Sequence, residues 1–229
     1  MDVITHSVIA ETVYRRCPDQ LQAFLRLSDL ELHYWSHLPD QVDQDNITPT
    51  GNCLLEEAWA HSYKLHWDRD KDLVTPVGGS AVEVLTATPR LARNAAKEGR
   101  FDEVREHLAR SIHVSTDLAT IWHLTRDLPK EYHKDGEAEL ARVARKVLHP
   151  ALELEPLKLP QPKSLYESLA ILAEETLRTQ FDRVKAAQAA GGIVKTREWA
   201  LAKEMLTRCA GQSLAVLLYA WRYVQATWK

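Results

Sequence analysis

Apolar residues recur at three- and four-residue spacing along most of this chain, which is the pattern of amphipathic α-helices. Proline and glycine separate the periodic stretches and predict where the helices end. The predicted helices cover Val3 to Arg16, Asp19 to about His37, Leu54 to Leu65, Ser80 to Lys97, Phe101 to Leu128, Gly136 to Leu148, Ser164 to Ala190 and Thr196 to Trp228. Trp67 to Gly79 is predicted to be a loop, and the proline-rich stretch at about 149–163 an extended connector. We therefore expect an all-α fold, with residues 1–229 forming a single compact multi-helix domain.

The amino-acid composition excludes several classes of protein. The chain has 229 residues, 45% of them hydrophobic and 27% charged, which is ordinary for a globular protein and excludes a disordered or collagen-like one. The formal net charge of -3 gives no strong overall field to recruit nucleic acid or an anionic membrane. The sequence contains no stretch of about 18 consecutive apolar residues, so no transmembrane segment is predicted. Glycine-rich phosphate loops and serine-nucleophile motifs are also missing from the sequence.

The cysteines and the first residues predict a cytoplasmic location. Cys17, Cys53 and Cys209 are far apart, odd in number and never in a CxxC pair. This usage is typical of reduced thiols and gives no support to a zinc-finger or thioredoxin-like reading. The first residues also lack the basic and apolar regions of a signal peptide.

Histidines and carboxylates carry the candidate chemistry. His113 and Asp117 are four positions apart, so on a helix both project from one face and can share a metal ion. His123 follows six positions later, roughly 120° around the helix. It would reach a second ion beside the first, unless a helix end redirected it. His133 and Glu137 repeat the four-residue spacing.

Two interpretations of this pattern stay open at this point. Imidazole with carboxylate is the ligand set that suits catalytic zinc, and also iron or manganese. In the alternative, the same residues form hydrogen-bonded pairs on a solvated helix face.

The order and spacing of these residues resemble the zinc-ligand signature of a family. The zinc-dependent phospholipase C and single-strand-specific zinc nuclease superfamily has His-x3-Asp-x5-His followed by His-x3-Glu or His-x3-Asp, as this sequence does. The family's early histidine is matched by His6, and the aspartate after its second helix by Asp40. A further family histidine is matched by His66, which we favour, or by His61.

The resemblance implies an all-helical enzyme with up to three zinc ions in a cleft between helices. It implies one site formed by Asp40, His66 or His61, His113 and Asp117, a second by His123, His133 and Glu137, and a third by His6, Asp117 and the amine of Met1. The chain departs from the family at residue 1, which is Met where the family has Trp, and at Thr116, where the family has Gly.

These features together predict a zinc-dependent phosphoester hydrolase, with phosphodiesters as the expected substrates, that uses two or three ions and a metal-bound hydroxide. The resemblance makes Asp117 a bridging ligand, and Asp40 could both bind metal and orient the attacking water. Trp35, Trp67 and Trp122 adjoin proposed ligands in the sequence and are candidates to line the cleft. Expected substrates are a phosphoester small molecule, a lipid headgroup or single-stranded nucleic acid. The alternatives are a non-catalytic scaffold or binding protein on the same fold, and an iron or manganese enzyme that does not catalyse hydrolysis.

Overall fold

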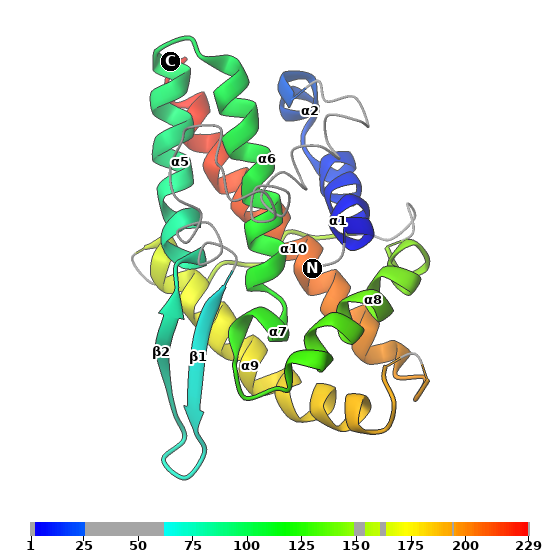
Figure 1. Ribbon diagram of the computed structural model, residues 1–229. Coiled ribbons are helices and arrows are strands. Elements are labelled where there is room, and N and C mark those ends of the chain that lie inside the picture. The colour runs from blue at the N-terminus through cyan, green and yellow to red at the C-terminus, as the bar shows by residue number, and fades with distance from the viewer. Residues whose placement is uncertain (1–2, 26–61, 149–153, 161–163, 194, 229) are drawn as a thin grey trace.

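A computed structural model describes residues 3–25, 62–148, 154–160, 164–193 and 195–228. Most of these residues are helical (Figure 1), which confirms the all-α prediction. The single-domain prediction is not tested by this arrangement and stays a prediction.

Three helices form the centre of the molecule. Helices α5 (Ala81–Lys97), α6 (Phe101–Leu118) and α10 (Trp199–Gln225) pack against one another (Figure 1). Helix α1 (Val3–Arg16) contacts both α6 and α10. Every residue of α6 from Ser111 to Leu118 is consequently buried. A helix end enclosed in this way can hold polar side chains out of reach of solvent.

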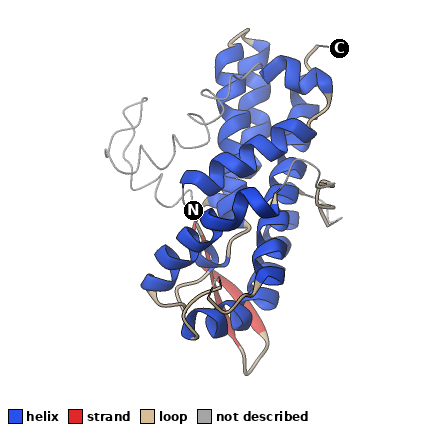
Figure 2. Ribbon diagram, turned by 90° about the vertical axis from the view of Figure 1, so that its right-hand side faces the viewer, coloured by secondary structure: helices blue, strands red, loops and turns tan. Residues whose placement is uncertain are grey.

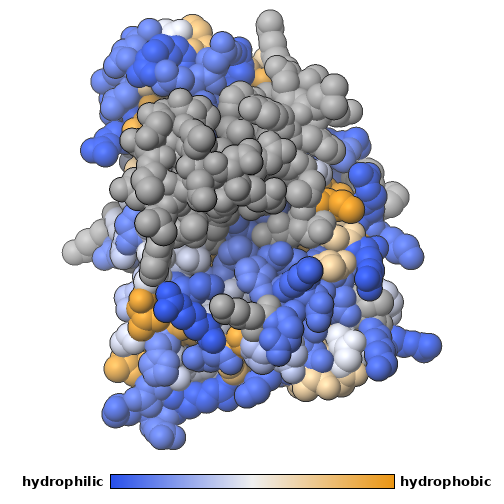
Figure 3. Space-filling view, in the orientation of Figure 1, coloured by the Kyte–Doolittle hydropathy of each residue, from blue (hydrophilic) through white to orange (hydrophobic). Residues whose placement is uncertain are grey.

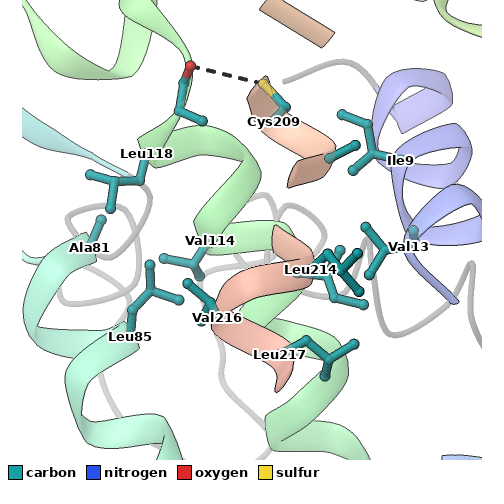
Figure 4. Close-up of a cluster of buried hydrophobic side chains, with 14 of the residues drawn as sticks. Ile9, Val13, Ala81, Leu85, Val114, Leu118, Cys209, Leu214, Val216 and Leu217 are labelled. Atoms are coloured by element: carbon teal, nitrogen blue, oxygen red, sulfur yellow. Dashed lines mark hydrogen bonds between the residues drawn. The ribbon is translucent and has the colours of Figure 1, made fainter. Parts of the chain in front are cut away.

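The apolar core joins these central helices. Figure 4 shows Ile9 of α1, Leu85 of α5, Val114 of α6 and Val216 of α10 converging in one cluster. All four side chains are almost completely buried. Burying an aliphatic side chain of this size contributes about 1.5–3 kcal/mol, so this cluster fixes how α1 sits against α6.

The remaining helices surround that core. Helix α2 (Asp19–Leu25) follows α1, α8 (Lys130–Val147) packs against α1 and α10, and α9 (Leu165–Ala189) packs against α5. The predicted second helix therefore begins where expected, and its continuation to His37 lies outside the described residues. Residues 154–160 are non-helical, in agreement with the predicted connector.

Glycines end two helices as the sequence predicted. Gly99 follows α5 with φ of +71°, a left-handed conformation that glycine adopts without strain. Gly191 and Gly192 have φ of +102° and +111° between α9 and α10. Helix α10 begins at Trp199 rather than at Thr196.

A β-hairpin replaces the loop predicted over Trp67 to Gly79. Strand β1 (Tyr63–Asp68) pairs antiparallel with β2 (Leu73–Gly79), and the hairpin extends from one end of the helices (Figure 2). The predicted helix from Leu54 to Leu65 is wrong in its last residues, which belong to β1; its earlier part lies outside the described residues. Buried Tyr63 and Leu65 alternate with more exposed residues over too short a run to stand out from a helical pattern. Pro76 is tolerated because a two-stranded sheet has an unpaired edge on each strand.

The long helix predicted from Phe101 to Leu128 is also wrong, since α6 ends at Leu118. Thr120 adopts an extended conformation, and its hydroxyl donates to the carbonyl of Thr116 at 2.8 Å. A single helical turn, α7 (Ile121–Leu124), follows. This break changes the direction of the chain just before His123.

Helix α8 begins at Lys130, earlier than the Gly136 predicted from the sequence. Pro129 precedes it, and proline is favourable at a helix start because it has no N–H to satisfy. Both His133 and Glu137 therefore lie within one regular helix.

None of the helices in the described ranges is long and apolar enough to cross a membrane. The face of the molecule in Figure 3 is mainly hydrophilic where residues are described, with small separate apolar areas. The predicted cytoplasmic location remains untested. Cys17 and Cys209 are both buried, and no disulfide joins them.

Candidate metal centre

The first group of candidate ligands joins α1 to α6. His6 Nε2 lies 3.2 Å from Asp117 Oδ1, and His113 Nε2 lies 3.2 Å from Asp117 Oδ2. The two imidazole rings stack with their centroids 3.9 Å apart and an interplanar angle of 11°. All three side chains are almost completely buried. Residues 107 positions apart in the chain, His6 and His113, thus flank one carboxylate.

The second group joins α7 to α8. His123 Nε2 lies 3.2 Å from Glu137 Oε1, and His133 Nε2 lies 2.7 Å from the same oxygen. The two rings meet edge to face, with centroids 4.7 Å apart. His123 is buried, whereas His133 and Glu137 are partly exposed, so this group opens toward the surface.

Asp117 connects the two groups. Its Oδ1 atom lies 3.2 Å from His6 Nε2 and also 3.5 Å from His123 Nε2. The break after α6 makes this possible, because in a continuous helix His123 would point about 120° away from Asp117. The helix end thus redirects His123 toward Asp117, and His123 also belongs to the second group.

The environment keeps His6 and His123 neutral at neutral pH. Burial, together with the nearby His113, lowers the pKa of His6 to about 3. Burial likewise lowers the pKa of His123 to about 4, against the opposing effect of Asp117. Neutral imidazole is the form that binds a metal ion, so these rings do not have to lose a proton first at neutral pH.

The same environment keeps the carboxylates ionised. Burial alone would raise the pKa of Asp117, but attraction to the imidazolium forms of the surrounding histidines at low pH, led by His123, holds it well below its ordinary value. Burial also acts to raise the pKa of Glu137, and hydrogen bonds with His123 and His133 overcome it and keep that pKa below its ordinary value. Ionised carboxylates beside neutral imidazoles are the protonation states a divalent cation requires.

The hydrogen bonding of His6 supports a metal-binding role. Its Nδ1 and Nε2 atoms are buried, and neither makes a hydrogen bond within the described residues. Nε2 nevertheless lies only 3.2 Å from Asp117 Oδ1. Leaving a buried polar atom unsatisfied costs about 1–3 kcal/mol, which coordination to an ion would offset.

The donor atoms are close enough to hold ions. Within each group, one ligand atom from each of the three side chains lies within 4.8 Å of the others. Nitrogen and carboxylate oxygen donors suit zinc, and iron or manganese as well. The alternative of pairs on a solvated face does not fit the first group, because His113 and Asp117 are fully buried.

Of the other predicted metal ligands, only His66 is among the described residues. Met1, Trp35, Asp40 and His61 are outside the described residues. His66 is on β1 with 58% of its side chain exposed, and its Nδ1 lies 3.8 Å from Asp127 rather than beside either group.

The two described tryptophans differ in position. Trp67 packs on the hairpin, where its Nε1 donates to Asp72 at 3.2 Å and the guanidinium of Arg69 lies 4.5 Å from the centre of its ring. Trp122 is buried directly before His123 and lines a cavity beside the second group. Of the two, only Trp122 is placed where it could contact a ligand at these residues.

That cavity measures about 740 Å³ and is lined by two residues of the second group, His133 and Glu137. Lys64 and Arg126 also line it, and neither was predicted from the sequence as a site residue. The sequence held little sign of them: Lys64 reaches the cavity only because β1 is a strand.

Comparison with known proteins identifies the fold. No protein-family profile and no curated protein sequence matches this chain. Among solved structures it is similar to the alpha-toxin of Clostridium absonum, with a TM-score of 0.59 and 14% identity over 98% of this chain and 65% of the toxin. The alpha-toxin of an avian strain of Clostridium perfringens gives a TM-score of 0.59 and 14% identity over 97% of this chain and 63% of the toxin.

The similarity is one of fold. It confirms the all-helical fold that the resemblance implied, and the zinc-ligand signature of that resemblance rests on the sequence. The chain spans just under two thirds of the length of each toxin.

Proposed function

We propose that this chain is a metal-dependent phosphoester hydrolase, with zinc as the expected metal and two or three ions per chain. The observation that carries the proposal is the position of Asp117, whose carboxylate lies between the imidazoles of His6 and His113 and within 3.5 Å of His123. The phospholipase C-like fold supports a hydrolase of that kind. Phosphodiesters of small molecules, lipid headgroups or single-stranded nucleic acid are the substrate classes to test.

The residues have separate tasks under this proposal. His6, His113 and Asp117 would hold one ion in the buried group, and His123, His133 and Glu137 would hold another nearer the surface. Zinc held by such ligands lowers the pKa of a coordinated water to about 7 and offsets charge on phosphoryl oxygens. Asp117 has two carboxylate oxygens, so it can serve both groups and fix their separation. Asp40 is proposed as a further ligand that also orients the attacking water.

Burial of the first group contributes to this chemistry. Electrostatic attraction is stronger where water is excluded, so the His6 and Asp117 side chains bind a cation more tightly than exposed groups would. The partly exposed second group faces the cavity, which is where a substrate can approach.

Elemental analysis tests the proposal most directly. The protein is purified without chelators or a His-tag, and its zinc, iron and manganese content per chain is measured. Two or three zinc ions, followed by hydrolysis of bis(4-nitrophenyl) phosphate or single-stranded DNA, would support it. Iron or manganese at similar occupancy would shift the chemistry away from hydrolysis. A protein that takes up no metal after reconstitution would contradict the proposal and favour the scaffold alternative.

A further inference from the structure

A second cavity lies between the extended segment at residues 154–160, the start of α9 and the later part of α10. It measures about 520 Å³, which is within the usual range for a small-molecule site. None of the described residues that line it belongs to either ligand group or lines the cavity beside the second group. This cavity is therefore separate from the candidate metal centre.

Hydrogen bonds hold the extended segment in place on both sides of the cavity. The backbone N–H of Leu157 donates to the carbonyl of Gly211 on α10 at 2.9 Å, and the hydroxyl of Ser168 on α9 donates to the carbonyl of Pro160 at 2.8 Å. A Cβ atom at position 211 would lie 3.2 Å from the carbonyl oxygen of Glu155, so the segment approaches α10 closely there. The walls of the cavity are consequently fixed without a ligand.

The face of α10 that lines the cavity changes from apolar to polar along the helix. Ala215 and Leu218 are followed by Tyr219 and Arg222, and spacings of three and four positions place all four side chains on one face. The other walls add three leucines to the apolar part, namely Leu157, Leu159 and Leu165. A ligand that matches this lining has an apolar part beside Ala215 and a polar part beside Arg222.

The charged side chains of this lining are both cations. Lys158 and Arg222 line the cavity together with no carboxylate of the described residues, and within those residues neither cation forms an ion pair. The phenol of Tyr219 stays neutral as well, because its hydrogen bond with Tyr223 raises its pKa to about 12. The polar part of the lining therefore favours an anion, which would form charge-assisted hydrogen bonds with these groups.

The extended segment offers a ligand few hydrogen-bond donors. Pro156 and Pro160 have no N–H, and the N–H of Leu157 is already bonded to Gly211. A peptide in this cavity would find few partners for its backbone carbonyls, whereas an alkyl chain requires none.

We propose that this cavity binds a fatty acid, with the alkyl chain beside Ala215 and Leu218 and the carboxylate on Arg222 and Lys158. The planar guanidinium of Arg222 can donate two parallel hydrogen bonds to the two oxygens of a carboxylate. The inference does not depend on the proposed function and adds a second ligand site to the chain.

Calorimetric titration of the full chain with dodecanoate, below its micelle concentration, tests the inference. The parent should bind one dodecanoate per chain. Arg222→Gln and Lys158→Gln should each weaken binding about tenfold, because each loses one charge-assisted hydrogen bond. Both lining cations are exposed, so these variants should fold. Lys203→Gln removes an exposed cation of α10 that does not line the cavity, and this control should bind dodecanoate as the parent does.

Two further ligands separate the contributions of the chain and the head group. Decanoate lacks two methylene groups of dodecanoate and should bind the parent about tenfold more weakly. Decanol has the chain length of decanoate without its charge, so it should bind about tenfold more weakly again. Replacing Arg222 should leave the affinity for decanol unchanged.

Three results would overturn the inference. The first is a parent that does not bind dodecanoate, or binds it no better than Arg222→Gln and Lys158→Gln do. The second is binding that is lost in His133→Gln and retained in Arg222→Gln, which would place the carboxylate at the metal centre. The third is an acidic, leucine-rich peptide that displaces dodecanoate and binds more tightly, which would make the cavity a protein-binding site. Each of these results leaves the proposed function to its own test of metal content and hydrolysis.

Discussion

Gly136 of α8 lies directly against the indole ring of Trp122, and a Cβ atom at position 136 would overlap that ring. The contact holds α7 against α8, which brings His123 next to His133 and Glu137. A glycine inside a helix usually costs about 0.5–1 kcal/mol relative to alanine. Here the absence of a side chain is what allows the second ligand group to form.

Gly136→Ala should therefore weaken the second group. Despite the gain in helix propensity, the overlap with Trp122 should destabilise the protein by about 1–3 kcal/mol, as overpacking usually does. Displacement of α7 should also lower metal content by about one ion per chain. Thermal unfolding and elemental analysis measure the two effects. Ala141→Gly, elsewhere on α8, is the control: it should lose about 1 kcal/mol without losing metal. Normal metal content in Gly136→Ala would show that the contact does not position the ligands.

Replacing Asp117 should remove more metal from the protein than replacing His133. Asp117→Asn takes the shared carboxylate from both groups, so metal at both and all hydrolytic activity should be lost together, while the helical circular dichroism persists. His133→Gln affects a ligand of the second group only, so that protein should keep about one ion. Elemental analysis of the two variants side by side checks the difference. Full metal content in Asp117→Asn would remove Asp117 from the site.

The buried histidines predict how the metal-free protein responds to acid. An unfolded histidine binds a proton near pH 6.5, whereas folded His6 and His123 do so only near pH 3 and pH 4. Between these values the unfolded state holds more protons, so stability is full above about pH 7 and falls as the pH is lowered through 6.5. The loss should be at most about 1.4 kcal/mol per pH unit for each histidine. The depressed pKa values of Asp117 and Glu137 act in the same direction at lower pH, because protonating these carboxylates removes their stabilisation.

Thermal melts of chelator-treated protein between about pH 7.5 and pH 5 measure this slope. His6→Gln removes one of the titrating groups and should flatten the curve. The exposed His66→Gln should retain the parent's slope and is the matched control. A His6→Gln protein with the parent's pH dependence would contradict the assignment of the slope to His6.

The sequence predicted which of these side chains lie close together within one helix. The four-residue spacing places His113 with Asp117, and His133 with Glu137, through helix geometry alone. The end of α9 at Gly191 and Gly192 was also predictable from local sequence, because glycine adopts the left-handed backbone conformation without strain.

What the sequence could not show depends on contacts between distant segments. The break after Leu118 is stabilised by the Thr120 hydroxyl and by the Cys209 thiol of α10, whose sulfur lies 3.9 Å from the carbonyl oxygen of Ala119. Periodicity within residues 101–128 gives no sign of that partner. Gly136 likewise suggests a helix boundary by composition, and only the neighbouring Trp122 explains why it lies inside α8.

The hairpin is a second case in which the sequence alone did not show where a side chain lies. His66 was favoured as a ligand from its distance to His113 along the chain, but on β1 the side chains alternate between faces. A histidine there is oriented by the strand register, which pairs it with Thr75 and leaves it exposed. Lys64 lies two positions earlier, before an irregularity in the strand pairing between Lys64 and Leu65, and lines the cavity instead.

Glu139 provides a test that separates stability from metal binding. This buried carboxylate accepts a hydrogen bond from the backbone N–H of Ile193 at 2.7 Å and another from Gln188 Nε2 at 3.2 Å. It thereby fastens α8 to the turn at Gly192, where a Cβ atom would overlap the carboxylate.

Glu139→Ala leaves the Ile193 N–H buried without its acceptor, which should lower the free energy of unfolding by about 1–3 kcal/mol. Metal content should not change, because Glu139 belongs to neither ligand group. Urea unfolding and elemental analysis on one preparation measure both quantities. The exposed Glu131→Ala on the same helix should alter neither. Loss of metal from a folded Glu139→Ala protein would mean that the turn after α9 helps position His133 and Glu137. The ligand groups would then depend on a larger part of the fold than the helices that carry them.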